Sequence, residues 1–419
     1  MVWQKELMNM RRPHYAWAVC LGSALSLFAI IGLGINIFSV YQPYIIELNH
    51  FTNAQGSMIT TVRSLFIVGA MLNVNQLCGK FGLRRVMTFG MGLMVLSCVC
   101  FGFATSFPAY CVAAALTGLA YGYGGMVPLS LVIGHWFRDR RGFALGVASA
   151  GSGVSTIFAP RLVTELIETQ GMKAAFLLEA AFILALTFLV WLLIRNSPED
   201  MGMEPYHLGG AEAPVPPPQA APAGMTKALS CALLFAAFLT GAPGGPGFSH
   251  LTVLYTTSGY DSMTVAALIS FLGIMICVGK IICGQVYDAV GGILGNWYTF
   301  GCFIVAFILC CMAPVGGLVL PYLAITLFGL GIPISNISFA AWAGDLYGGD
   351  KGYESAVRSF TVAFAIGMLL FGPVPGILAD HFGSYVPAYV LFVGTLLIST
   401  AIVQYAYGKL NVGHRPQKP

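Results

Sequence analysis

Long apolar runs limit what this chain can fold into more than any other feature of its sequence. Twelve runs of about 20 mostly apolar residues follow one another along the 419 residues, and a bilayer-spanning helix needs a run of about that length. Only 9% of the residues are charged, against roughly 25% in soluble domains. A soluble fold of this size needs far more polar surface, so the sequence predicts a multi-pass membrane protein.

The predicted fold is all-α, with twelve transmembrane helices in two six-helix bundles. The expected spans are 14–37, 57–78, 85–105, 108–134, 142–164, 174–194, 227–248, 262–284, 292–313, 318–341, 355–377 and 385–407. A stretch rich in proline, alanine and acidic residues separates the sixth span from the seventh and is typical of a flexible linker. The predicted domains are an N-terminal bundle (1–195), a cytoplasmic linker (196–226) and a C-terminal bundle with a short cytoplasmic tail (227–419).

The positions of the cations predict the orientation in the membrane. With the N-terminus inside, 16 of the 20 Lys and Arg residues fall in cytoplasmic segments, one falls outside and three lie within spans. Both termini are therefore expected in the cytoplasm, with the protein in a plasma membrane, and a bacterial inner membrane is the expected location. A net charge of +4 does not favour a nucleic-acid binder. The sequence shows no catalytic triad, metal site or nucleotide motif, so neither an enzyme nor a cofactor is predicted.

Corresponding loops in the two predicted bundles share a pattern. GKFGLRRVM at 79–87 matches GQVYDAVGG at 284–292, and TQGMKAAF at 169–176 matches HFGSYVPAY at 381–389, in the same order and at the same helix spacing. A duplicated six-helix unit is typical of transporters built from structural repeats. The chain is therefore predicted to transport a solute across the membrane.

Longer motifs carry a family resemblance. They are HYAW (14–17), FSVYQPYI (38–45), GLAYGYGGMVPLSLVIGHWFRDRRGFALG (118–146) and GPVPGILADHFGSYVPAY (372–389). With them the chain resembles the major facilitator superfamily, and within it the branch of monocarboxylate porters and oxalate/formate antiporters. The resemblance implies the major facilitator fold and alternating access to a central site. The superfamily's loop signature is matched by Gly284, Asp288 and Gly291 in the second half, and by Lys80, Gly82, Arg84 and Arg85 in the first.

Charged side chains inside the membrane are costly, which makes them candidates for function. Lys280 is predicted near the middle of span 8, and in the resembled family this helix carries an arginine that grips the substrate carboxylate. Lys280 is therefore predicted to bind substrate, and as a lysine it is also a candidate to exchange a proton. The same helix face carries small and polar residues at Gly273, Cys277, Gly284 and Asp288. Arg63 in span 2 is expected about 12 Å further out by helix rise. It is the second candidate for substrate binding, unless it marks the outer interface.

Other polar residues complete the predicted site. Glu179 in span 6 is a candidate proton carrier, although it could equally pair with Arg63 or Arg161. His250 is expected in a loop at the outer face and is the remaining candidate for passing a proton. Neutral groups that could bind a carboxylate or close a gate are Asn36, Tyr41, Tyr121, Tyr123 and Asn336, although helix-packing hydrogen bonds explain such residues equally well.

The predicted function is secondary active transport of a small organic anion, with a lactate-like monocarboxylate as the first expectation. Arg63 and Lys280 are opposed chiefly by Glu179, so a buried site with surplus positive charge favours an anion. Proton symport and anion exchange both stay open. The alternatives are a short dicarboxylate (oxalate-like) antiporter, a proton-driven drug exporter, and a sensor that binds an anion without moving it. The expected partners are the anion, protons and the lipid bilayer, with no nucleic acid, and the expected functional unit is a monomer.

Overall fold

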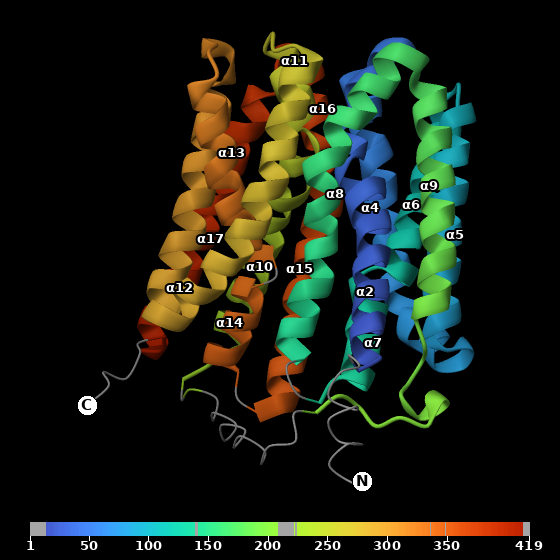
Figure 1. Cartoon of the computed structure of the whole chain (residues 1–419). Coiled ribbons are helices and arrows are strands. Elements are labelled where there is room, and N and C mark those ends of the chain that lie inside the picture. The colour runs from blue at the N-terminus through green and yellow to red at the C-terminus, as the bar shows by residue number, and fades with distance from the viewer. Residues whose placement is uncertain are drawn as a thin grey trace.

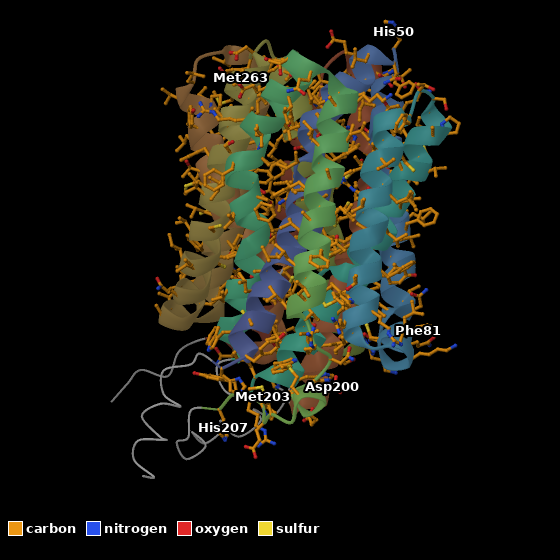
Figure 2. All side chains as sticks on the ribbon, turned by 45° about the vertical axis from the view of Figure 1, so that its right-hand side comes forward. His50, Phe81, Asp200, Met203, His207 and Met263 are labelled. Atoms are coloured by element: carbon orange, nitrogen blue, oxygen red, sulfur yellow. The ribbon has the colours of Figure 1, made fainter. Side chains whose placement is uncertain are left out.

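The computed structural model describes residues 14–138, 141–207, 222, 224–335, 337–347 and 349–413. Within these ranges the chain is almost wholly helical and has no strand, only an isolated bridge between Phe137 and Tyr206. The long helices run side by side (Figure 1). The first described helix begins, and the last one ends, at the same end of the molecule, which we call the terminal end. The opposite end is the distal end, where His50 and Met263 lie (Figure 2).

The first half of the chain contains six membrane-length helices. Its helical segments are α2 (Ala16–Leu27), η1 (Phe28–Asn36), α3 (Phe38–Leu48), α4 (Asn53–Phe81), α5 (Leu83–Phe103), α6 (Phe107–Gly124), α7 (Met126–Trp136), α8 (Arg141–Gln170), α9 (Met172–Leu193) and the short η2 (Glu199–Met201). The segments α2, η1 and α3 form one span, and α6 and α7 form another.

The second half repeats this arrangement. Its segments are α10 (Lys227–Ala242), η3 (Pro243–Gly247), α11 (Leu251–Thr257), α12 (Ser262–Cys311), η4 (Ala313–Val315), α13 (Val319–Gly331), η5 (Ile332–Ser335), α14 (Ile337–Leu346), α15 (Gly349–Phe371), α16 (Val374–Phe382) and α17 (Val386–Leu410). We call residues 14–207 the N-half and residues 224–413 the C-half. Helix α12 holds two spans because its backbone breaks at Gly291.

The predicted twelve-helix membrane fold is confirmed. Ten helices of the described part are long and apolar enough to cross a bilayer, and α13 to α14 form an eleventh span that is bent by 43°. The twelfth is α8, which has 30 residues and runs along the bundle beside these spans (Figure 1). Buried apolar side chains form two separate clusters, one within residues 16–194 and one within residues 229–410.

Two tight turns at the terminal end are built alike in the two halves. Gly82 separates α4 from α5 with φ 84° and ψ 149°, and Gly291 divides α12 with φ 82° and ψ 177°. A side chain with a Cβ rarely adopts such a positive φ. The sequence predicted loops of nine residues here, but one glycine reverses the chain in each case, so helices continue into both predicted loops.

Replacing Gly291 by alanine is expected to lower stability by about 1–3 kcal/mol, because the turn needs a backbone conformation that only glycine adopts easily. Gly301 is the matched control, since it lies within the helix and a Cβ there meets no described atom within 4 Å. Thermal unfolding of the purified variants checks this. Gly291→Ala should lower the melting temperature, whereas Gly301→Ala should leave it unchanged or raise it. Equal melting temperatures would contradict this account of the turn.

The first span of each half is interrupted by a π-helical segment. In the N-half the interruption is η1, and in the C-half it is η3, whose sequence is PGGPG. Prolines remove backbone donors, and glycines let neighbouring helices approach closely, so both residue types favour a break at η3. Interrupted helices near the middle of the membrane are common where transporters bind their substrates.

The first span continues further than predicted, because it was expected to end at residue 37 and reaches Leu48. The seventh ends at Gly247, within one residue of its expected end at 248, and the short helix α11 follows it up to Thr257. Polar residues that the sequence placed close to the distal surface therefore lie inside the protein.

Candidate functional site

The N-half and C-half cross closely where α8 meets α12. A methyl group at Gly153 would overlap Sγ of Cys277, and one at Gly273 would overlap the backbone of Thr156 and Ile157. Glycines at such a crossing allow two helix backbones to approach each other. The predicted small-residue face of span 8 therefore does meet the other half, through its portion nearer the distal end.

Further toward the terminal end the same two helix faces no longer touch. Gly146 lies seven residues before Gly153, and Gly284 lies seven residues after Cys277, which keeps each on the same helix face two turns away. A Cβ at either Gly146 or Gly284 would meet no described atom within 4 Å. The two halves therefore touch toward the distal end and diverge toward the terminal end.

Lys280 lies one turn beyond the crossing, on the side where the halves diverge. It is half-buried, about 27 Å along α12 from Ser262 by helix rise. The described part of the chain contains one ion pair, between His207 and Glu204, so no described carboxylate lies within 4.0 Å of the Lys280 ammonium. Lys280 is therefore a cation without an ion-pair partner among the described residues, next to the contact between the halves.

Arg63 is the other cation in this region, and it is more deeply buried. It lies about 15 Å along α4 from Asn53, and only 5% of it is exposed. Its guanidinium carbon lies 5.3 Å from the centre of the Phe38 ring, and Nη2 is 3.5 Å from the Ser249 hydroxyl of the C-half. Nε and Nη1 are buried and have no hydrogen-bond partner. Arg63 therefore has two donors, Nε and Nη1, to which no described residue supplies an acceptor.

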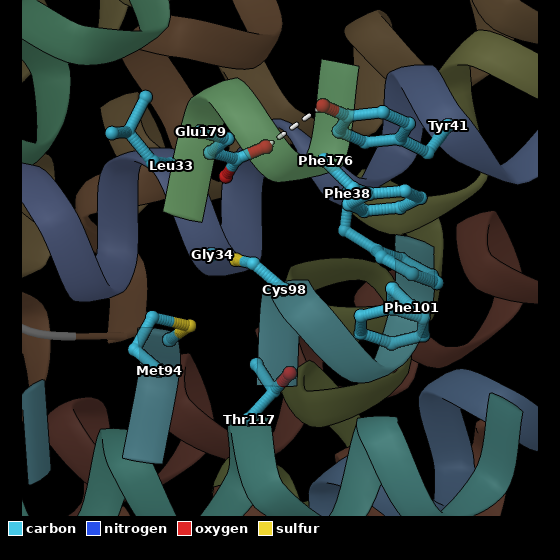
Figure 3. Close-up of a pocket in the computed structure, with 10 residues that line it drawn as sticks. All are labelled: Leu33, Gly34, Phe38, Tyr41, Met94, Cys98, Phe101, Thr117, Phe176 and Glu179. Carbon is cyan, nitrogen blue, oxygen red and sulfur yellow. Dashed lines mark hydrogen bonds between the residues drawn. The ribbon is translucent and has the colours of Figure 1, made fainter. Parts of the chain in front are cut away.

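Glu179 pairs with a tyrosine and not with a cation. The Tyr41 hydroxyl donates to Oε2 of Glu179 over 2.8 Å, and the Tyr41 ring stacks on Phe176 at 3.9 Å. Both residues line a narrow cavity within the N-half, with room for about one water molecule (Figure 3). Phe38 also lines this cavity and contacts Arg63. The alternative, a pair of Glu179 with Arg63 or Arg161, does not form, since no ion pair links these residues and Tyr41 binds the carboxylate.

The remaining predicted site residues do not gather at one point. Asn36 donates from Nδ2 to the Thr156 hydroxyl over 3.0 Å, beside the crossing of α8 and α12. Tyr121 is half-buried, and Tyr123 packs within the N-half with its ring 6.1 Å from Phe89. Asn336 lies outside the described residues. Asn36 thus lies beside the contact between the halves.

The prediction that His250 lies in a loop at the outer face is wrong, because its side chain is fully buried. His250 directly precedes α11, three residues after span 7 ends at Gly247. Nδ1 lies 2.9 Å from the Pro246 carbonyl, which can only accept, so Nδ1 donates and the neutral ring presents Nε2 as an acceptor. Ser57 Oγ at 2.8 Å and Gln42 Nε2 at 3.2 Å, both from the N-half, donate to it.

The loop-signature residues serve the turns at the terminal end. Arg84 donates from Nε to the Trp191 carbonyl over 2.9 Å, and its guanidinium lies 4.3 Å from the Trp191 ring centre. Lys80 lies over the Phe81 ring, and Arg85 is exposed. The backbone of Asp288 is helical, but its side chain lies outside the described structure. In the described part, these cations bind their own half and do not bridge the two halves.

The sequence did not single out several residues that join the halves. They are Gln42, Asn53, Ser57, Ser249, Asp380 and Tyr385. Polar residues of this kind, either neutral or near the ends of spans, are common on membrane helices. No periodic or compositional signal therefore marks them. One signal was available for Asp380, which lies in the family-like motif at 372–389 but was not considered separately.

Two six-helix halves whose first spans are interrupted and that cross at glycines, with Arg63 and Lys280 near their contact, have the architecture of a membrane transporter. Residues 24–353 match the family model of the Major Facilitator Superfamily, and the chain belongs to this family. Among solved structures, a point mutant of the nucleoside transporter NupG superposes with a TM-score of 0.74 at 12% identity, covering 95% of this chain and 100% of that chain. The predicted family and fold are confirmed.

The relatives differ in what their names say they transport. The chain is 27% identical to monocarboxylate transporter 13 of Bos taurus, over 78% of this chain and 75% of the relative. It is 25% identical to the oxalate:formate antiporter of Oxalobacter formigenes, over 38% of this chain and 39% of the relative. It is also 26% identical to the fujikurins efflux protein of Gibberella fujikuroi, over 43% of this chain and 39% of the relative.

Proposed function

We propose that the protein is a secondary active transporter of small organic anions, with monocarboxylates as the first class. The observation that carries this proposal is a pair of cations that have no ion-pair partner among the described residues, Arg63 in the N-half and Lys280 in the C-half. The names of the monocarboxylate and oxalate relatives support the same class of substrate.

Burying an ionised group without a partner costs several kcal/mol. Only 5% of Arg63 is exposed, and its Nε and Nη1 have no hydrogen-bond acceptor among the described residues. A carboxylate is the acceptor that a guanidinium binds best, and it would also neutralise the charge. A small organic acid would thus provide the carboxylate acceptor that Arg63 lacks among the described residues.

The two cations come from opposite halves, which suits alternating access. An anion that reaches Lys280 enters between halves that diverge at the terminal end, and closure around it would bring it toward Arg63. With both termini in the cytoplasm, as the distribution of Lys and Arg favours, the distal end faces outward and the structure corresponds to an inward-open state. In this state the anion reaches Lys280 from the cytoplasmic side of a plasma membrane.

Transport measurements on the purified protein in liposomes test the proposal. Radiolabelled lactate, formate, acetate and oxalate are offered with an imposed inward proton gradient, with preloaded anion, or with neither. Saturable uptake of a monocarboxylate supports the proposal, and preferential uptake of oxalate shifts it to the dicarboxylate alternative. Uptake of amphipathic cations or neutral drugs, with none of the four anions, would contradict it and favour a drug exporter.

We further propose that Glu179 and Tyr41 form the proton site if transport is coupled to protons. The carboxylate is buried beside a water-sized cavity, and one hydrogen bond from Tyr41 holds it. Glutamine can accept the same bond but cannot exchange a proton.

Glu179→Gln is expected to reduce gradient-driven accumulation at least about tenfold, while exchange into preloaded vesicles stays within about twofold. Glu165→Gln is the matched control, because Glu165 is exposed and, among the described residues, makes no ion pair with Arg161. Unchanged accumulation by Glu179→Gln would exclude Glu179 as the proton carrier.

A further inference from the structure

We propose that Asp380 closes the distal side of the transporter by capping helix α4 of the opposite half. Asp380 lies near the end of α16 in the C-half. Its Oδ1 accepts from the backbone N–H and the side-chain Nδ2 of Asn53, both at 2.9 Å, and its Oδ2 accepts from the backbone N–H of Ala54 at 2.8 Å. Asn53 and Ala54 are the first two residues of α4, where a helix has free donors and a positive dipole end.

Helix α4 satisfies only part of its own first turn. Thr52 accepts from the Gln55 backbone N–H, and the Gln55 side chain accepts from the Thr52 backbone N–H, so this capping box serves two donors. The other two donors, at Asn53 and Ala54, are the ones that Asp380 binds. The cap of α4 is therefore complete only when the two halves are together.

The surrounding contacts hold Asp380 in place across the interface. The Tyr385 hydroxyl of the C-half donates to Oδ1 of Asn53 over 2.9 Å. A methyl group at Gly376 would overlap the Asn53 carbonyl and the Ser57 hydroxyl, so α16 lies directly against α4. Ser57, one turn along α4, also bonds to His250 of the C-half. The distal contact is thus polar and closely packed.

Opening the distal side must separate α4 from α16. The Asp380 carboxylate and the two backbone donors then return to water, and the charge-assisted bonds between them are lost. Asp380 therefore favours the distally closed state without touching substrate, which makes it a positioning residue for alternating access. Asp380 acts on the balance between conformations, and this role is independent of which solute the protein transports.

A second aspartate provides a control of the same chemistry. Asp261 caps α12, accepting from the Thr264 backbone N–H at 2.8 Å and from the Thr264 hydroxyl at 2.6 Å, within its own half. Tyr389 is likewise matched to Tyr385, because its hydroxyl donates to the Gly247 carbonyl of its own half over 2.7 Å. Asp261 and Tyr389 contribute to stability without joining the halves.

The test measures how fast Cys277 reacts from the distal side. Cys277 lies at the crossing of α8 and α12, so distal opening should expose it. Cells are treated with a membrane-impermeant thiol reagent, and labelling is quantified at the Cys277 peptide by mass spectrometry. The exposed distal residue Glu47, replaced by cysteine, identifies the membrane face that is the distal side. Asp380→Asn is expected to raise distal labelling of Cys277 about fivefold, and Tyr385→Phe about twofold.

Asp261→Asn and Tyr389→Phe should leave the labelling rate at the wild-type value, and Asp380→Glu should lie closer to wild type than Asp380→Asn. Wild-type labelling in both Asp380→Asn and Tyr385→Phe would overturn the proposal. An increase of equal size in Asp261→Asn would overturn it as well, because loss of any helix cap would then have the same effect. If Asp380→Asn does not fold, the Cys277 labelling rates of Tyr385→Phe and Tyr389→Phe are compared instead. Equal rates in these two variants would overturn the proposal.

Discussion

Uptake by the Lys280→Gln variant is expected to fall at least about 30-fold at subsaturating anion. Truncating one partner of a buried charge pair costs about 2–5 kcal/mol, and each 1.4 kcal/mol is a factor of ten. Lys280 has no described carboxylate within 4.0 Å, so its removal leaves no described acid unpaired, and we expect the loss to fall on the bound anion. Initial rates in proteoliposomes measure the effect.

Lys280→Arg and Lys173→Gln are the comparison variants. Arginine keeps the charge and should retain part of the uptake, although its planar fork needs a different geometry. Lys173 is an exposed cation over the Phe103 ring at the distal end, and its loss should change uptake less than about twofold. Full uptake of every transported anion by Lys280→Gln would show that Lys280 is not in the binding site.

The Arg63→Met variant is expected to be at least as stable as the wild type and to transport at least about tenfold more slowly. A buried charge without a partner destabilises a fold, and an apolar side chain of similar size is often neutral or stabilising by about 1–4 kcal/mol. Arg63 has two buried nitrogen atoms without partners. Melting temperature and initial uptake rate, measured on one preparation, separate the two effects.

Arg84→Met should show the opposite change in stability. Arg84 donates to the Trp191 carbonyl and stacks on the Trp191 ring, so its loss removes contacts and should lower the melting temperature. A marked fall in the melting temperature of Arg63→Met would mean that Arg63 serves the fold. Wild-type uptake by a stable Arg63→Met variant would remove Arg63 from the site.

The number and order of the helices were predictable because each span needs its own apolar run and each tight turn has its own glycine, as at Gly82 and Gly291. The lengths of the spans were less predictable. Polar residues after Asn36 suggested that the first span ends, but Ser39, Tyr41 and Gln42 are buried by other helices and not by lipid. Hydropathy indicates which segments can contact lipid, but it does not predict polar contacts between the helices of a bundle.

The candidate site was predictable only where it carries charge. Lys280 and Arg63 stand out because few charges lie within the spans, but no sequence pattern indicates that Glu179 binds Tyr41. The contact between the halves was not predictable, because it depends on which helices become neighbours. Asp380 is one of several acids near span ends, and only the placement of α16 against α4 distinguishes it from Asp261.

Equilibrium binding of a radiolabelled monocarboxylate to the purified protein is the most direct test of whether Lys280 binds a small carboxylate, since it needs neither a gradient nor a complete transport cycle. We expect saturable binding to the wild type, at least about 30-fold weaker binding to Lys280→Gln, and unchanged binding to Lys173→Gln. Binding of equal strength to the wild type and Lys280→Gln would contradict it, as would the absence of binding of any small carboxylate to a folded wild-type protein.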